Sequence, residues 1–310
     1  MSQSRSTVSF LSLRALWLLL VLVVFSGCKS DAPPLLLQKK PQDATMALDR
    51  MAECLRKNDL VGFSHVLTTP TQFAQLEAAW HSGHTQWPFS IWPLGQDIPP
   101  LLAFLSSPNA TQSFQAIFNR QLANQDGPID NAIRSLAMFG TQFLDSQSAL
   151  YSAQQRSYYK QLIHVLADWG VRAPLADRER AYHAIADLTA TTRSSGLASQ
   201  AALSRLGMEE SLRRLGPVWQ VLKSSLLTYG LDIDRALIQF KTELVSQSGD
   251  EALVRVHYTL AQHEIETTVP MIRREGKWYP KQVQDAIARN LAASVSSHSD
   301  ETPVPPIFGQ

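Results

Sequence analysis

The chain has 310 residues, of which 45% are hydrophobic and 18% are charged. This balance is typical of one large or two small globular domains and excludes a disordered or polytopic membrane protein. The formal net charge is +1; without residues 1–28, which hold Arg5 and Arg14, 26 basic residues face 27 acidic ones. Because no broad basic field remains, the composition argues against nucleic acid as a partner.

The amino terminus has the three parts of an export signal. Arg5 and Arg14 precede an unbroken apolar run at residues 15–25, and two small residues follow it. The run is shorter than the roughly 20 apolar residues that a membrane-spanning helix needs. We therefore predict a signal peptide over residues 1–27.

Phe25-Ser26-Gly27-Cys28 resembles the lipobox of bacterial lipoproteins, in which an apolar residue and two small residues precede a cysteine. The resemblance implies cleavage before Cys28, a diacylglycerol on its thiol, and an acylated amino group. Two or three acyl chains make a firm membrane anchor, whereas one binds marginally. Phe25 replaces the usual leucine, so ordinary cleavage and an uncleaved anchor stay open. In enteric-type bacteria, Lys29 in place of aspartate implies sorting to the periplasmic face of the outer membrane, whereas other bacteria follow other sorting rules.

Two terminal segments lack any sustained period. Residues 28–42 contain three prolines and three lysines, and we expect them to form the lipidated cysteine and a flexible tether. Residues 296–310 contain three prolines among Ser, Asp and Glu, and we expect a disordered tail. The only other cysteine, Cys54, has no partner for an intramolecular disulfide once Cys28 is lipidated, and we expect it in the core.

Residues 43–231 are dominated by the helical period, with apolar residues three and four apart. Asp177 is placed to begin one helix, which ends near Gly196, and Gly230 is placed to end the last one. Each apolar stripe needs neighbours, so this region predicts an irregular helical bundle. The principal stripes are Ala44/Leu48/Met51/Leu55, Ile133/Leu136/Ala137/Gly140/Phe143/Leu144, Tyr158/Leu162/Val165/Leu166/Trp169, Ala181/Ile185/Leu188, Leu203/Leu206 and Leu212/Leu215/Val218/Trp219/Leu222/Leu226.

Residues 232–295 change to the period of two that is typical of strands. Alternation over residues 238–244, 252–260 and 265–271 predicts an antiparallel meander, with turns at Ser248-Gly249-Asp250 and Glu275-Gly276-Lys277. A closing helix is expected at residues 282–293. The fold class we predict is therefore α+β: a mostly helical amino-terminal region, then a three- to four-stranded antiparallel sheet and a helix.

The strand pattern at residues 237–279 resembles the carboxy-terminal hairpins of NTF2-like (cystatin-like) domains found in bacterial lipoproteins. The shared features are a Gly-Asp turn, a Thr-Val strand and a closing Gly-Lys-Trp-Tyr. The helical pattern at residues 47–67 is similar to the opening of such domains. More than 150 helical residues separate the two parts, so a compact NTF2 cone does not describe the whole chain.

Catalytic and metal motifs are weak. His81 and His84 flank Gly83 in a turn without further ligands at metal spacing, so we predict a solvated loop and no metal or cofactor. Ser157-Tyr158-Tyr159-Lys160 matches the Ser-x-x-Lys of penicillin-recognising enzymes, but Lys241-Thr242 is followed by glutamate where that chemistry needs glycine.

The most unusual composition lies at residues 87–100, where Trp87, Phe89, Ile91 and Trp92 stand close together in a proline-rich segment. Proline stiffens the chain, so the segment is an irregular loop with four large apolar groups. Such rings either plug a groove between helices or form a partner-binding patch. The plug is the commoner outcome, and the loop is also the candidate partner-binding site.

Arg255, His257, Glu264 and Glu266 are expected on the sheet face that points away from the core. That face is either solvated or, if helices fold over it, the lining of a concavity.

The sequence favours a membrane-anchored envelope lipoprotein with a non-catalytic binding or scaffolding role. An inhibitor or immunity-type partner of a periplasmic protein is one concrete form, and a hydrolase acting on envelope material is the alternative.

Overall fold

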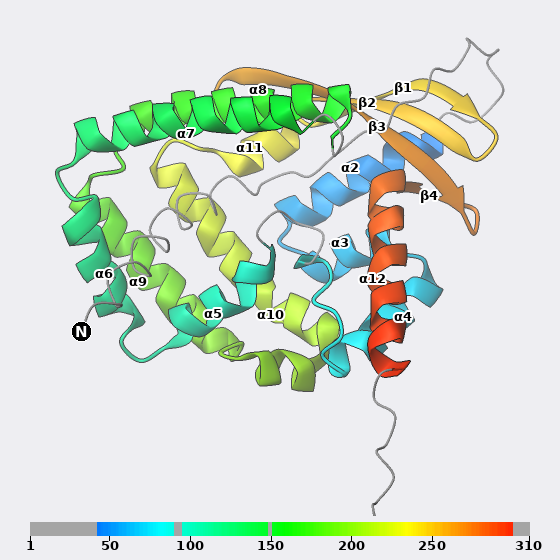
Figure 1. The fold of residues 1–310 in the computed structure, drawn as a ribbon, viewed down its shortest axis with the longest axis horizontal. Helices are drawn as coiled ribbons and strands as arrows, with labels where there is room; N and C mark the ends of the chain where they lie inside the picture. The colour runs from blue at the N-terminus through cyan, green and yellow to red at the C-terminus, as the bar shows by residue number, and fades with distance from the viewer. Residues whose placement is uncertain (1–41, 90–94, 148–150, 300–310) are drawn as a thin grey trace, which may run out of the picture.

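The computed structural model describes residues 42–89, 95–147 and 151–299 (Figure 1). The predicted signal peptide, the lipobox with Cys28, and nearly all of the expected tether lie outside the described residues. Within those residues, no helix combines the length and apolar character that crossing a membrane requires. The expected tail at residues 296–310 starts too early, because the last described helix continues to Ser299.

Helices fill the first part of the described chain, as the periodicity predicts. They are α2 (Gln42–Arg56), α3 (Leu60–Leu67), α4 (Pro70–His81), the 3₁₀ turn η2 (Gly95–Asp97), α5 (Ile98–Ser106), α6 (Ala110–Gln121), α7 (Asp126–Ser146), α8 (Ala153–Arg172), α9 (Arg178–Ser195), α10 (Gln200–Thr228) and α11 (Ile233–Ile238). Local chemistry sets many of their ends. The Asp177 carboxylate accepts from the Arg180 amide at the start of α9, and Gly196 ends that helix in the left-handed region.

α10 is broken at Gly207, whose φ of 81° lies in the region that favours glycine. A Cβ added there would lie 2.2 Å from Oε1 of Glu77. The Glu77 carboxylate accepts from the amides of Met208 at 3.1 Å and Glu209 at 3.0 Å, so it caps the second segment from α4. The separate helical patterns expected before and after this position are thus confirmed.

The sheet is a four-stranded antiparallel meander in the order β1 (Lys241–Ser248), β2 (Glu251–Leu260), β3 (His263–Arg274) and β4 (Lys277–Pro280). α12 (Lys281–Ser299) follows, which confirms the α+β class. The expectation that the first strand begins at residue 238 is wrong. Asp232 accepts from the Arg235 amide and starts α11, so Ile238 ends a short helix.

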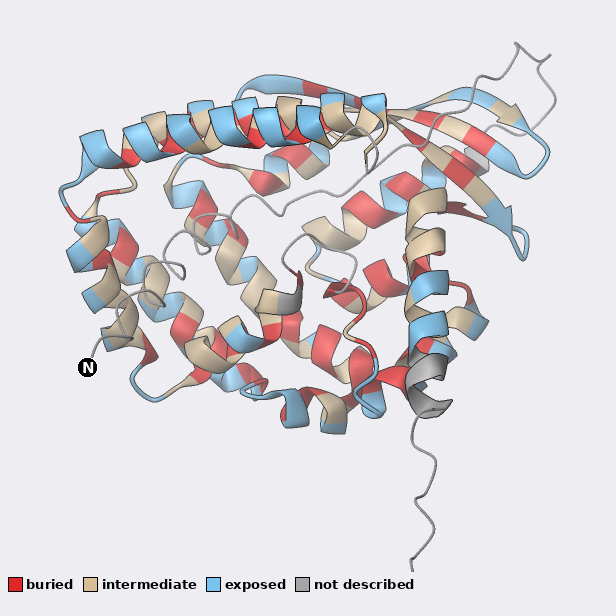
Figure 2. Cartoon of the chain, in the orientation of Figure 1, coloured by how far each residue is buried: buried red, intermediate tan, exposed pale blue. Residues whose placement is uncertain are grey.

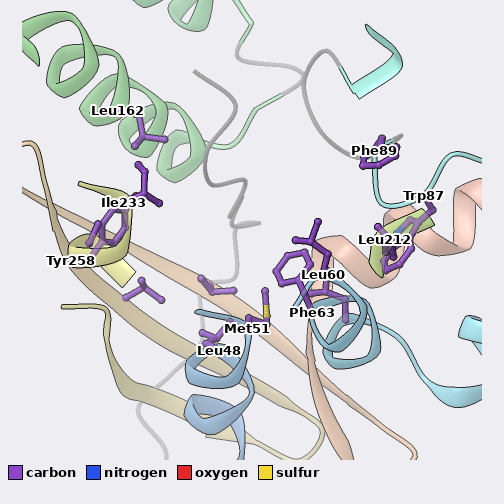
Figure 3. Packing of buried hydrophobic residues seen from close by; sticks show 14 of the residues in the cluster. Leu48, Met51, Leu60, Phe63, Trp87, Phe89, Leu162, Leu212, Ile233 and Tyr258 are labelled. Atoms are coloured by element: carbon purple, nitrogen blue, oxygen red, sulfur yellow. The ribbon is translucent and has the colours of Figure 1, made fainter. Parts of the chain in front are cut away.

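One main hydrophobic cluster joins the helices to the sheet. Alternate residues of β2, among them Val254, Val256 and Tyr258, are buried on the inner face. Figure 3 shows Tyr258 facing Ile233 of α11 and Leu162 of α8, with residues of α2 alongside. The expected helical region and sheet therefore share a core.

α8 covers the free edge of β3. Because β4 pairs only with the last residues of β3, from Met271 on, the earlier part of β3 has no strand on that side. Gln161 fills the gap: its Nε2 donates to the Glu266 carbonyl at 3.0 Å, and its Oε1 accepts from the Glu266 amide at 3.1 Å. Gln154, two turns earlier, donates to the Thr268 carbonyl at 3.2 Å. A helix covering an edge in this way blocks pairing with another strand.

Candidate functional site

The structure contradicts a partner-binding surface formed by Trp87 and Phe89. Their exposed fractions are 0% and 3%, and both belong to the main core. The ring of Phe89 lies 5.9 Å from that of Trp80 in α4, and Figure 3 shows Trp87 beside Leu212 of α10. The plug is confirmed for these two rings, whereas Ile91 and Trp92 lie outside the described residues.

The plug follows from how the loop closes. The Trp87 amide donates to Thr85 Oγ1 at 3.2 Å, which turns the chain inward. Gly95 then passes so close that a Cβ there would lie 1.6 Å from the Phe89 carbonyl oxygen. The burial of Trp87 and Phe89 in the main cluster stabilises the core and leaves these two rings unavailable to a partner.

His81 and His84, the two histidines of the weak metal motif, each contact another group of the protein. His81 Nδ1 lies 2.8 Å from the Ser204 carbonyl oxygen, and its Nε2 lies 3.2 Å from Glu77. His84 Nδ1 lies 2.9 Å from the Ser82 hydroxyl. Among the described residues no group of three or more His, Cys, Asp or Glu side chains is placed to hold a metal ion.

Lys160 of the Ser-x-x-Lys motif forms an ion pair with Asp145, 2.6 Å away, and so links α8 to α7. Cys54, expected inside the core, is a free thiol that is only half-buried and packs against the core from its side. Burial raises the pKa of this thiol, which keeps it protonated. Neither residue offers an activated nucleophile.

The outer sheet face is solvated. Arg255 lies 2.9 Å from Glu243 and 3.4 Å from Glu266, and His257 lies 3.8 Å from Glu264. All these side chains are substantially exposed, while α2 and α11 pack with the opposite face. The alternative in which helices fold over this face is therefore wrong.

An open groove of about 530 Å³ lies between α7 and α8. The two helices run side by side along one edge of the molecule (Figure 1), with exposed residues along their outer side (Figure 2). We call it the α7–α8 groove; its lining is Arg134, Ala137, Met138, Thr141, Gln142, His164, Ala167, Asp168 and Val171.

The groove is mostly apolar with charged groups at its margins. Met138 is 62% exposed, an unusual state for a large apolar side chain at the mouth of a groove. Asp168 accepts from Arg172 at 2.7 Å and lies 2.6 Å from Nε2 of His263, at the start of β3. These two partners hold the carboxylate in place, whereas Arg134 has no ion-pair partner in the described part of the chain. The groove therefore offers apolar contact between an oriented anion, Asp168, and a cation, Arg134, that no described residue pairs with.

Apolar periodicity does not reveal this groove, because α7 has more apolar residues than one buried stripe needs, and Met138 at the groove lies outside the predicted stripe. Ile133, Gly140 and Leu144 of the predicted stripe are buried. Phe143, expected in the same core face, is 46% exposed, and its neighbour Phe139 is 63% exposed. A count of apolar positions against the width of one helical face is the signal that could have found it.

Comparison of this chain with protein-family models, with curated proteins and with solved structures finds no match. The lipobox and NTF2-like resemblances therefore rest on the residues that carry them.

Proposed function

We propose that this protein is a bacterial envelope lipoprotein that binds a partner protein through the α7–α8 groove. In this proposal, lipid on Cys28 holds the chain at the outer membrane, and the helical body works in the periplasm. The role is non-catalytic: binding or scaffolding, with inhibition of a periplasmic protein, or immunity to one, as its concrete form.

The observation that carries the binding role is Met138, exposed in a groove of about 530 Å³ with charged margins. Binding hot spots combine an apolar anchor in a pocket with polar groups around it. Ala137, Ala167 and Val171 leave room for one apolar side chain of a partner. Arg134 then pairs with an acidic group beside that anchor, and Asp168 with a donor.

The same groove lacks the arrangement that a hydrolase needs. Thr141 is the hydroxyl residue of the lining, and its Oγ1 donates to the Ala137 carbonyl of its own helix at 2.8 Å. The Asp168–His263 pair resembles an oriented acid–base pair, but no serine or cysteine lines the described groove beside it. Binding is therefore the function that the groove supports best.

The anchor is tested by mass spectrometry of the full chain purified from membranes. We expect a fragment that begins at Cys28 and carries diacylglycerol and an amide-linked acyl chain. In Triton X-114 the native chain enters the detergent phase, and the Cys28→Ser variant moves to the aqueous phase. Equal partitioning of the two chains, or an unmodified Cys28, contradicts the lipoprotein proposal.

The groove is tested by recovering partners from detergent-solubilised envelope with the native chain and with Met138→Glu. A charge in the apolar groove is expected to abolish recovery of a specific partner. Leu227→Glu is the matched control, because Leu227 is also exposed, at 54%, but lies on α10. If both variants recover the same partners as the native chain, the groove is not the binding site.

A further inference from the structure

α7 carries a second apolar stripe, on the opposite flank from the groove. We call Ala132, Leu136, Phe139 and Phe143 the α7 seam. These residues are four, three and four positions apart, so at about 100° per residue they form one narrow strip. Leu136 is half-buried and the other three are exposed, with Phe139 at 63%. The strip has the spacing of a coiled-coil interface without a covering helix among the described residues.

The seam is separate from the surfaces already described. Ile133 of α7 packs on Gly170 of α8 and marks the buried face. Arg134 and Met138 line the groove, on the flank opposite the seam. Arg134 is also the only charged residue between Ala132 and Phe143. The seam is thus an uncharged apolar strip along one side of the helix.

We infer that the seam is covered by the α7 seam of a second copy of this chain, packed antiparallel in a two-fold symmetric dimer. The spacing of four, three and four reads the same from either end, so an antiparallel copy fits in register. Ala132 then lies opposite the partner subunit's Phe143, and Leu136 lies opposite the partner subunit's Phe139. A small side chain facing a large one gives the interdigitation that close packing requires.

The polar residues that border the seam are also complementary between the two copies in this antiparallel register. Ser135 and Gln142 are exposed, Gln142 at the border between the seam and the α7–α8 groove, and the antiparallel arrangement places Ser135 beside the partner subunit's Gln142. A hydroxyl and an amide pair as donor and acceptor, and no like charges meet along the strip.

Two other occupants fit the strip less well. A parallel second copy places Phe143 against Phe143 and Ala132 against Ala132, which leaves a clash and a gap. A membrane surface attracts helices whose apolar face is bordered by lysine and arginine. The seam has no such border, because Arg134 lies on the groove side.

The test is sedimentation equilibrium of the full chain in density-matched detergent. We expect the native chain to form a dimer, and Phe139→Ser to raise the dissociation constant at least about tenfold. Ile238→Ser, at a residue 68% exposed on α11, is the matched control and leaves the dimer unchanged. A native chain that stays monomeric throughout, or equal effects of the two substitutions, overturns the proposal.

A charge pair tests the register. Ala132→Lys and Phe143→Glu are each expected to weaken the dimer, since each places one charge in an apolar seam. The double variant is expected to regain dimerisation, because the introduced charges of opposite sign face each other across the antiparallel interface. Both sites are exposed, so circular dichroism of each variant should match the native chain. A double variant weaker than both single variants contradicts the antiparallel register.

Discussion

α7 and α8 are the two helices of one hairpin, with 21 and 20 residues, yet their outer surfaces differ in chemistry. α8 places its large apolar residues, such as Tyr158 and Trp169, in the core and uses glutamine side chains to cover the β3 edge. α7 leaves Met138, Phe139 and Phe143 in solvent. α8 thus commits its largest apolar residues to the fold of its own chain, whereas α7 also leaves large apolar residues exposed. Exposed apolar surface of that kind marks the side on which a protein meets other molecules.

The largest effect is expected where α8 holds the fold together. Trp169 is 7% exposed, and its Nε1 donates to the Tyr229 carbonyl at 2.8 Å. Trp169→Ala is expected to lower the free energy of unfolding by about 3–5 kcal/mol, because it opens a cavity and leaves that carbonyl without its donor. Chemical denaturation measures the change, and a loss below about 1 kcal/mol would contradict the role assigned to α8.

A smaller effect is expected at the buried hydroxyl pair between α8 and β2. Tyr158 and Tyr258 place their hydroxyl oxygens 3.0 Å apart, and both side chains are buried. Tyr158→Phe is expected to lower the free energy of unfolding by about 1–2 kcal/mol, since Tyr258 loses its partner. An unchanged denaturation midpoint would show that the pair adds nothing to stability.

The same pair predicts a dependence on pH. Burial raises the pKa of Tyr158 and that of Tyr258 well above the usual value of a tyrosine. Above about pH 10 the unfolded chain therefore loses these protons while the folded chain keeps them, so stability is full below pH 10 and falls as the pH rises. The fall is expected to be shallower in Tyr158→Phe, as denaturation at pH 9 and pH 11 would show; equal slopes would contradict it.

The edge contact of α8 is expected to contribute less. Gln161→Ala removes both hydrogen bonds to Glu266, and we expect a loss of about 1 kcal/mol, because water can reach this part of the strand. Hydrogen exchange at the Glu266 amide should accelerate at the same time. Unchanged exchange at Glu266 would contradict the proposed covering of the β3 edge.

The smallest effect on folding is expected on α7. Phe139→Ser is expected to change the free energy of unfolding of the monomer by no more than about 0.5 kcal/mol, because the ring is already in solvent. Thermal unfolding at a concentration below that of dimerisation measures this. A large loss would mean that Phe139 belongs to the core of its own chain.

Local chemistry made much of the fold predictable. The change of period after Gly230 indicated the order of helices and strands, and Asp177 and Gly196 indicated the ends of α9. The same kind of pattern failed at Ile238, because two alternating apolar residues fit the end of a short helix as well as a strand.

The candidate site could not be predicted in the same way. A periodic pattern shows that Ala137 lies on an apolar face of α7, but not whether a neighbour covers that face or leaves it to line a groove. The contact of Gln161 with Glu266 joins residues 105 positions apart and leaves no local signal. The burial of Trp87 likewise depends on its packing against α10, far along the chain.

Photo-crosslinking in intact cells tests most directly whether the apolar surface of α7, and not the charged sheet face, contacts a second copy. A photoreactive side chain is placed at position 139 of α7 or at position 264, where Glu264 is 81% exposed on the sheet face. We predict a crosslinked species from position 139 that contains two copies of this chain, and none from position 264. A crosslink from position 264 alone, or equal crosslinking from both, would contradict the assignment of α7 as the interaction surface.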